Sequence, residues 1–282
     1  MPLDGNYAAA YVGLADCYVR RAELGHLASS EAYGKAKTVT LKALEIDNGL
    51  AGAHASLALI RADYGWDWEG AESEFQRALE LDPKAVNTRQ WHAVTLAKIG
   101  RFKEATAERA IAKELDPLSL PVATSLGDIL RYARRHDEAI EELRRATDLE
   151  PSFKFAHVGL ANAYERKGMF REAASKWTLV NALSGDRVGN YAAVRDAAGY
   201  KHATRVWLEA LQEESRRKYV SPMAVAVVYA RLGNAEQTLR WLEEAYQRRD
   251  PGLSILKVEP LLDFLRSNPR FQDLLRRMNF PS

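Results

Sequence analysis

Apolar residues recur along the chain with the spacing of amphipathic helices. In the stretch 126–149 they form two runs at i, i+3 or i+4 and i+7, with the polar segment RRHDEA between the runs. This spacing puts the apolar side chains of each run on one helix face. The stretch therefore predicts a pair of helices joined by a tight turn. Its apolar positions are Leu126, Leu130 and Ala133 in the first run and Ala139, Leu143, Ala146 and Leu149 in the second.

The same pattern repeats about every 34 residues. Three units end in FQRALELDP, RAIAKELDP and LRRATDLEP, and their prolines, Pro83, Pro117 and Pro151, are 34 residues apart. Proline lacks an amide hydrogen and disfavours helix in the residue before it, so one helix ends here and the next can begin. An alanine in the second helix extends the period with separations of 35, 34, 34 and 34. These alanines are Ala36, Ala71, Ala105, Ala139 and Ala173, and Thr238 takes the position in a later unit.

Other signals complete the outline of the array. Gly100, Gly168 and Gly233 occupy the same point between two runs, where a left-handed residue ends the first helix without strain. Thr238 follows Ala173 by 65 residues, three fewer than two periods, so a degenerate unit is expected between them. We expect an array over 1–258 with units at about 6–48, 49–83, 84–117, 118–151 and 152–185, a degenerate unit at 186–218 and a last unit at 219–250.

Two structural roles can be predicted within this outline. Small residues recur where paired helices would cross, because a larger side chain there would push the helices apart. The segment 259–282 carries two short apolar stripes after Pro260 and Pro269, and we expect these capping helices to cover the open end of the array. The small residues are Ala58, Ala93, Gly127 and Ala161, and the stripes are Leu261, Leu262 and Leu265, then Phe271, Leu274, Leu275 and Met278.

The units resemble the tetratricopeptide repeat, whose signature is a large residue, Leu with Gly or Ala, Tyr, Ala, an aromatic residue or Leu, Ala and Pro. The fifth unit departs from it at Val180, where the family has Ala, and at Gly185, where the family has Pro. The resemblance implies an all-α right-handed superhelix of about seven helical hairpins with a C-terminal helical cap. The signature is carried by His157, Leu160, Ala161, Tyr164, Gly168, Ala173 and Trp177 in the fifth unit, and by Leu57, Ala58, Ala71, Phe75, Ala78 and Pro83 in the second.

Three irregular segments are similar to the C-terminal repeat region of bacterial multidomain signalling proteins. These proteins are winged-helix transcriptional regulators, serine/threonine kinases and adenylate cyclases. The segments are the insertion LGHLASSEAYGKA, the turn YGWDWEGA and the ending RDPGLSILKVEPLLDFLRSNPRFQDLLRRMNFP. The motifs of their effector domains do not occur in this sequence, and Asp4-Gly5 falls where a preceding unit would end. We therefore expect a fragment of a larger protein.

Composition narrows the function classes. Forty Lys and Arg against 38 Asp and Glu give a net charge of +2, a weak electrostatic case for nucleic acid or an anionic membrane. Cys17 is the only cysteine, which fits a reducing compartment, and we expect it to be a small buried residue within a helix. The sequence has no run of about 18 apolar residues and no signal-peptide pattern, so a cytoplasmic protein is expected.

Catalytic signatures do not occur in the sequence. It contains no HExxH, no Walker lysine, no cysteine pair and no GxGxxG after a strand. Among the histidines, His54 and His157 share one repeat position and His92 lies near it, which favours helix packing over zinc. We therefore expect no enzyme activity, no metal and no cofactor.

The first helices of a tetratricopeptide array line its concave face, so the resemblance implies a binding groove there. Its mixed side chains would hydrogen-bond an extended peptide, while Tyr132 and Phe155 would supply apolar contacts. The alternative is a solvated helix face. A clamp for a C-terminal carboxylate is not predicted, because the repeat position at which such a clamp has lysine holds other residues in these units. The groove candidates are Asn87, Gln90, Thr124, Asp128, Arg131, Tyr132, Phe155, Asn162, Glu165 and Arg166, with Asp16, Arg20 and Lys98 at matching positions.

A second candidate is the turn that contains Trp66 and Trp68, where exposed rings would anchor a partner. The competing interpretation packs these rings on the adjoining unit across a turn lengthened by one residue. We expect a non-catalytic scaffold, the sensory or partner-binding region of a larger protein, that binds a protein or peptide in its groove and makes no contact with nucleic acid or membrane. The alternatives are a homodimerisation module and a sensor of a small molecule.

Overall fold

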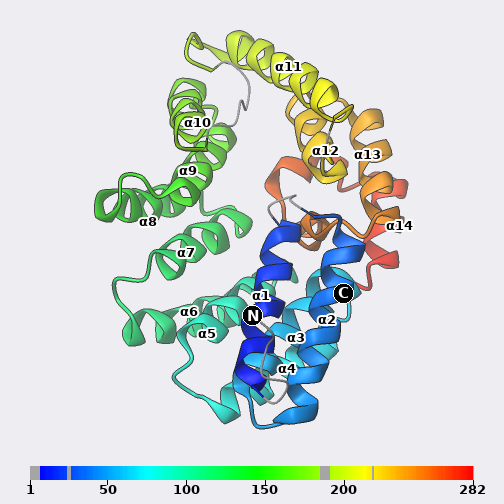
Figure 1. Ribbon diagram of the computed structural model, residues 1–282. Coiled ribbons are helices and arrows are strands. Elements are labelled where there is room, and N and C mark those ends of the chain that lie inside the picture. Colours follow the sequence, from blue (N-terminus) through cyan, green and yellow to red (C-terminus); the bar gives the residue numbers. More distant parts are fainter. Residues whose placement is uncertain (1–6, 24–26, 185–190, 218, 282) are drawn as a thin grey trace.

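The computed structural model describes residues 7–23, 27–184, 191–217 and 219–281, and in these residues the regular structure is helical throughout. This confirms the all-α class expected from the periodicity. In this part of the chain six pairs of antiparallel helices occur, with one long helix before the last pair (Figure 1). The pairs are α1 (Ala8–Glu23) with α2 (Ser29–Ile46), α3 (Ala51–Ile60) with α4 (Trp68–Leu81), α5 (Val86–Lys98) with α6 (Phe102–Leu115), α7 (Leu120–Tyr132) with α8 (His136–Leu149), α9 (Lys154–Arg166) with α10 (Phe170–Ser184), and α12 (Pro222–Arg231) with α13 (Ala235–Gln247).

The stretch expected to hold a degenerate unit contains, in its described part, the single long helix α11 (Ala197–Glu214). It follows α10 and packs on α12, so it links the fifth pair to the last one. Asp196 caps its N-terminus by accepting a hydrogen bond from the Gly199 amide at 2.8 Å. The shortened spacing before Thr238 therefore reflects one helix in place of a full pair.

The last five pairs, whose turns lie within the described residues, each turn through a residue in the left-handed region. Gly100, Gly168 and Gly233 have φ values of 89°, 72° and 72° at this point, as the sequence predicts. Two units use a side-chain-bearing residue instead, Arg134 with φ of 65° and Trp66 with φ of 53°. A left-handed conformation costs such a residue about 1–2 kcal/mol, so the side chains at these two turns need a compensating role.

The turn before α4 also absorbs the extra residue noticed in the repeat spacing. Helix α3 widens into a π-helical turn, η1 (Arg61–Gly65), and the Asp67 amide donates to the Arg61 carbonyl at 3.0 Å. A π-turn accommodates one more residue without breaking the helix. The Asp67 carboxylate then caps α4 through the Gly70 amide at 3.0 Å.

Small residues allow the paired helices to approach closely. Gly127 of α7 is buried, and a methyl group added there would overlap the Leu143 side chain of α8. The other residues expected at these crossings are Ala58, Ala93 and Ala161 on the first helices and Ala71, Ala105, Ala139 and Ala173 on the second, and each is fully buried.

The C-terminal segment bends back across the array. It comprises η2 (Pro251–Ile255), η3 (Pro260–Leu265) and α14 (Pro269–Arg277), and it packs on α12 and α13. In Figure 1 the red end of the chain lies beside the blue and cyan helices, and η2 contacts both α1 and η1. The first and last pairs are thereby joined through this segment. Its buried apolar residues include Leu261, Leu262, Leu265, Phe271, Leu274 and Met278, while Leu275 is half-buried.

Candidate functional site

A buried ion pair fastens the C-terminal segment to the concave face. Arg131, at the end of α7, donates from Nη1 to both oxygens of Glu259, at 3.0 and 2.8 Å. The two side chains are only 5% and 10% exposed. The neighbouring Arg134 hydrogen-bonds the Val258 carbonyl and the carboxylate of Asp263. The fourth unit therefore holds the segment by two adjacent arginines.

The Trp66 and Trp68 turn forms a second attachment. The Trp66 ring is 1% exposed, stacks on Tyr246 at 4.8 Å and lies 4.1 Å beneath the Arg249 guanidinium. Trp68 donates from Nε1 to the Met278 carbonyl at 3.0 Å and stacks on Phe280. The hypothesis of exposed anchors on this turn is thus wrong, because residues far along the chain cover both rings.

A third attachment joins α12 to α9. Arg231 donates from Nε to Glu165 at 3.0 Å and from Nη2 to Asn162 at 2.8 Å. Glu165 also accepts hydrogen bonds from the Tyr200 hydroxyl and from Arg166, both at 3.1 Å. This part of the concave face is therefore occupied by contacts within the chain.

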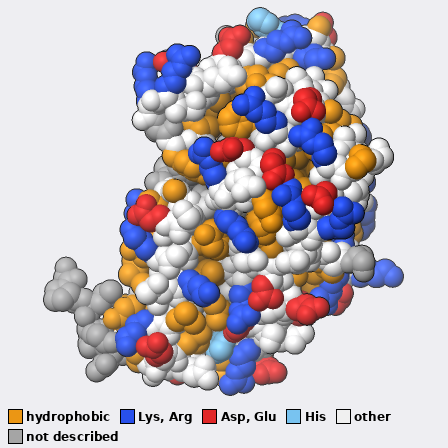
Figure 2. Space-filling view, turned by 90° about the vertical axis from the view of Figure 1, so that its right-hand side faces the viewer, with side chains coloured by type: hydrophobic (Ala, Val, Ile, Leu, Met, Phe, Trp, Pro, Cys, Tyr) orange, Lys and Arg blue, Asp and Glu red, His pale blue; other side chains and the backbone are white. Residues whose placement is uncertain are grey.

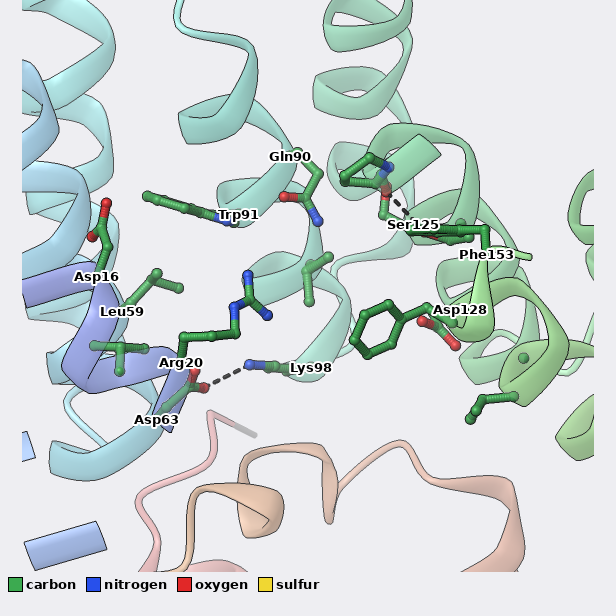
Figure 3. A pocket seen from close by; sticks show the side chains of 17 residues that line it. Asp16, Arg20, Leu59, Asp63, Gln90, Trp91, Lys98, Ser125, Asp128 and Phe153 are labelled. Carbon is green, nitrogen blue, oxygen red and sulfur yellow. Dashed lines mark hydrogen bonds and ion pairs between the residues drawn. The ribbon is translucent and has the colours of Figure 1, made fainter. Parts of the chain in front are cut away.

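The first helices of five successive units enclose the part of the concave face that stays open. They surround a cavity of about 540 Å³ (Figure 3). Its lining alternates apolar and charged side chains, with Asp16 and Arg20 on one side and Asp128 and Phe153 on the other in this view. Lining residues come from α1 (Asp16, Val19, Arg20), α3 with η1 (Leu59, Asp63), α5 (Gln90, Trp91, Val94, Lys98), α7 (Pro121, Thr124, Ser125, Asp128) and α9 with the residue before it (Phe153, Phe155, Val158, Gly159).

The charged groups of the cavity differ in how they are paired. Lys98 donates to Asp63 at 2.6 Å, and both side chains are largely buried. Asp16 accepts a hydrogen bond from the Ser56 hydroxyl at 2.6 Å, yet burial raises the pKa of its carboxyl. Burial also raises the pKa of Asp128, and the negative charge of Glu259 adds to this effect. The two aspartates therefore lack full compensation for their partial removal from water.

The structure separates the ten predicted groove residues into three sets. Gln90, Thr124, Asp128 and Phe155 line the cavity. Asn87 is exposed and lies outside this lining. Arg131, Tyr132, Asn162, Glu165 and Arg166 belong to the attachment of the C-terminal part or lie against it, which corrects the expectation that all ten face a partner.

Several cavity residues, among them Trp91, Phe153 and Asp63, were not among the groove candidates. Trp91 directly follows Gln90, and Phe153 precedes α9 and meets Phe155 edge-on at 5.8 Å between ring centroids. Asp63 lies in the π-turn and pairs with Lys98. The aromatic residues next to groove positions could have been found from the sequence. The repeat pattern gave no signal for the Lys98–Asp63 pair, whose partners are 35 residues apart.

The three histidines at matching or neighbouring repeat positions take part in helix contacts. His54 and His92 lie 2.7 and 3.2 Å from Glu74 and Glu72, and the His157 Nε2 lies 2.8 Å from the Pro151 carbonyl. Across the described ranges no three His, Cys, Asp or Glu side chains gather where a metal ion could be held. Cys17 is exposed on α1, so its expected burial was wrong. Among the helices in the described part of the chain, none has the length and apolar character to cross a membrane.

A family model described as tetratricopeptide repeat matches residues 121–153, which cover α7 and α8. Two solved structures are similar over nearly the whole chain. PilW, whose title calls it a widely conserved type IV pilus biogenesis factor, has a TM-score of 0.53 and 17% identity over 95% of this chain and 98% of its own. Pseudomonas aeruginosa PilF has a TM-score of 0.51 and 18% identity over 96% and 97%. At these identities the likeness shows the fold alone.

Curated relatives match about half of the chain. Transcriptional regulator HilA of Salmonella typhimurium is 28% identical over 142 residues, 49% of this chain and 26% of that protein. Human Protein O-mannosyl-transferase TMTC3 is 29% identical over 152 residues, 53% of this chain and 16% of that protein. The chain thus spans under a third of the length of either relative.

Proposed function

Because the chain is a tetratricopeptide repeat protein, we propose that it is a non-catalytic scaffold that binds an extended segment of a partner protein in its concave cavity. The observation that supports this most directly is the cavity itself. Five successive units each contribute side chains from the first helix or the residues next to it, so a bound segment would run along the array and meet each unit in turn.

The lining suits a peptide. Trp91, Phe153 and Phe155 offer ring surfaces, while Gln90 and Thr124 offer polar groups near them. Aromatic residues dominate the energy of protein interfaces because they bury large areas at little cost in side-chain entropy. By contrast, the face in Figure 2 shows Lys and Arg intermixed with Asp and Glu, which gives no basic surface for a nucleic acid on that side.

We further propose that the chain is the partner-binding region of a larger bacterial regulatory protein that acts in the cytoplasm. The similarity to transcriptional regulator HilA supports this context, since the matched part is 26% of that protein and leaves room for other domains there. The occupied cavity would then influence a domain outside this sequence.

The test compares two phenylalanines of nearly equal exposure. Phe155 lines the cavity and is 48% exposed, whereas Phe264 lies on η3 outside the cavity lining and is 46% exposed. We expect Phe155→Ala to lose a partner that the wild-type chain and Phe264→Ala both capture from lysate of the source organism, with all three equally folded by circular dichroism. Loss with both variants, or with neither, would place recognition elsewhere.

A small-molecule sensor is the second candidate, and the cavity volume favours it. About 540 Å³ lies within the range of ligand pockets, and the lining combines ring surfaces with a few polar groups. Native mass spectrometry of the purified chain would then show a co-purified mass that Phe155→Ala loses. Light scattering on the same sample tests homodimerisation.

A further inference from the structure

Three carboxylates lie where α7 meets the C-terminal segment and where α9 meets α12. Two of them accept close hydrogen bonds from arginines: Glu259 from Arg131 at 2.8 Å, and Glu165 from Arg231 at 3.0 Å. Arg166 donates to Glu165 as well, at 3.1 Å. The arginines here are thus directed at Glu259 and Glu165.

Asp128 is the third carboxylate. Its Oδ1 lies 3.5 Å from Nε of Arg131, and that nitrogen makes no hydrogen bond although it is buried. At this separation the attraction is coulombic and weak in direction. Arg131 therefore binds Glu259 more closely than it binds Asp128.

This carboxylate faces the open cavity. The Asp128 side chain is 43% exposed and lines the cavity together with Phe153 and Phe155. In Figure 3, Asp128 and Phe153 lie on one side of the cavity, opposite Asp16, Arg20 and Leu59. A carboxylate beside exposed aromatic rings is the environment that binds ammonium and guanidinium groups, because the ring face adds to the ionic attraction.

We propose that the Asp128 side of the cavity receives a lysine or arginine side chain of the bound partner segment. This inference rests on the proposed function, since it names the residue type that the partner presents to the scaffold. It is the reverse of a carboxylate clamp, in which the repeat supplies the cation.

The cations of the chain itself are placed to permit this. Lys98 is bound to Asp63, and in Figure 3 Arg20 lies on the other side of the cavity. Lys154 is the chain's own cation at the Phe155 ring, 5.7 Å from its centroid, so the partner's cation is assigned to the Asp128 carboxylate rather than to this ring. A basic partner residue is thus better placed near Asp128 than near Arg20.

The C-terminal segment sets the strength of this subsite. Glu259 accepts two hydrogen bonds from Nη1 of Arg131, and without that carboxylate the guanidinium would turn its charge toward Asp128. The same contact that closes the concave face therefore makes the cavity wall more negative.

The probes are two fluorescein-labelled, capped peptides that differ at one residue, Ala-Leu-Phe-Lys-Leu-Ala and the version with norleucine in place of lysine. Fluorescence anisotropy gives the affinity ratio of the two peptides for the full chain. Capping removes terminal charges, and spermidine, added as competitor, distinguishes a peptide side chain from a free amine. The variants are Asp128→Asn, Glu259→Gln and the control Asp273→Asn, whose native side chain is 50% exposed on α14.

We expect the wild-type chain and Asp273→Asn to prefer the lysine peptide by about tenfold. Asp128→Asn should abolish the preference and leave the norleucine peptide unchanged. Glu259→Gln, measured where circular dichroism shows it folded, should reduce the preference about threefold. Displacement of the lysine peptide by micromolar spermidine would overturn the peptide assignment.

An unchanged ratio in Asp128→Asn, or no binding of the lysine peptide up to about 1 mM, would overturn the proposal. Capture of a natural partner that depends on Phe155 but not on Asp128 would overturn this inference while leaving the proposed function intact. If Phe155→Ala and Asp128→Asn both still capture the partner, the proposed function is overturned as well.

Discussion

The Arg131–Glu259 pair should be the strongest single attachment of the C-terminal segment. Both side chains are at most 10% exposed, so Glu259→Gln leaves a buried guanidinium whose remaining ion-pair partner among the described residues is Asp128, at 3.5 Å. Removing one partner of a buried ion pair costs about 3 kcal/mol, because the other charge loses its compensation. For a chain of this size that cost lowers the melting temperature by about 6 °C.

The assay is a double-mutant cycle followed by thermal melting in circular dichroism. Arg131→Met and Glu259→Leu should each destabilise the chain by about 3 kcal/mol, whereas the double variant should lose much less than the sum, since apolar residues of similar volume replace the pair. Glu138→Gln, which breaks an exposed pair with Arg135, is the control and should not change the melt. Additive losses, or an unchanged melt of the single variants, would refute the role of this pair in attaching the C-terminal segment.

Three further outcomes are expected. Burial opposes ionisation of Glu259, but Arg131 holds the pKa of its carboxyl below the usual range. The contribution of Glu259 to stability is therefore present above about pH 4.3 and is lost as the pH falls through the lower folded-state pKa. In melts at decreasing pH, the difference in unfolding free energy between wild type and Glu259→Gln should shrink over that interval. Gly127→Ala should destabilise by about 2 kcal/mol in urea titrations because its methyl group overlaps Leu143, while Gly34→Ala, with open space at its Cβ, should stabilise by up to about 1 kcal/mol. Deleting 259–282 should lower the melting temperature and increase binding of an apolar dye; an unchanged melt without aggregation would remove the capping role.

The repeat could be predicted from the sequence because its determinants are local. Helix ends, left-handed glycines and small crossing residues each act within one unit, and they recur at one interval. The spacing of 35 residues before Ala71 even marked the unit that contains the π-turn. Exposure was less predictable, as Cys17 shows, because a helix position alone does not say which neighbour covers it.

The contacts of the C-terminal segment with the array could not be predicted in the same way. Trp68 bonds Met278 across 210 residues and Arg131 bonds Glu259 across 128, and neither pairing recurs in other units. The repeat period places Trp68 at a turn and Arg131 near the groove. It does not show which of these positions are covered by the C-terminal part of the same chain. This is why the groove prediction did not distinguish the residues that line the cavity from those that contact the C-terminal part of the chain.

The two exceptions to the glycine rule make physical sense in light of the closure. At the turn where three units have glycine, the second and fourth units keep Trp66 and Arg134 at a cost of about 1–2 kcal/mol each. Glycine would remove that strain but could make no contact with the C-terminal part. Trp66 instead stacks on Tyr246, and Arg134 binds Asp263. A left-handed non-glycine residue in a repeat turn therefore indicates a side chain used elsewhere in the fold, and in this chain both such turns lie where the array is joined to its own end.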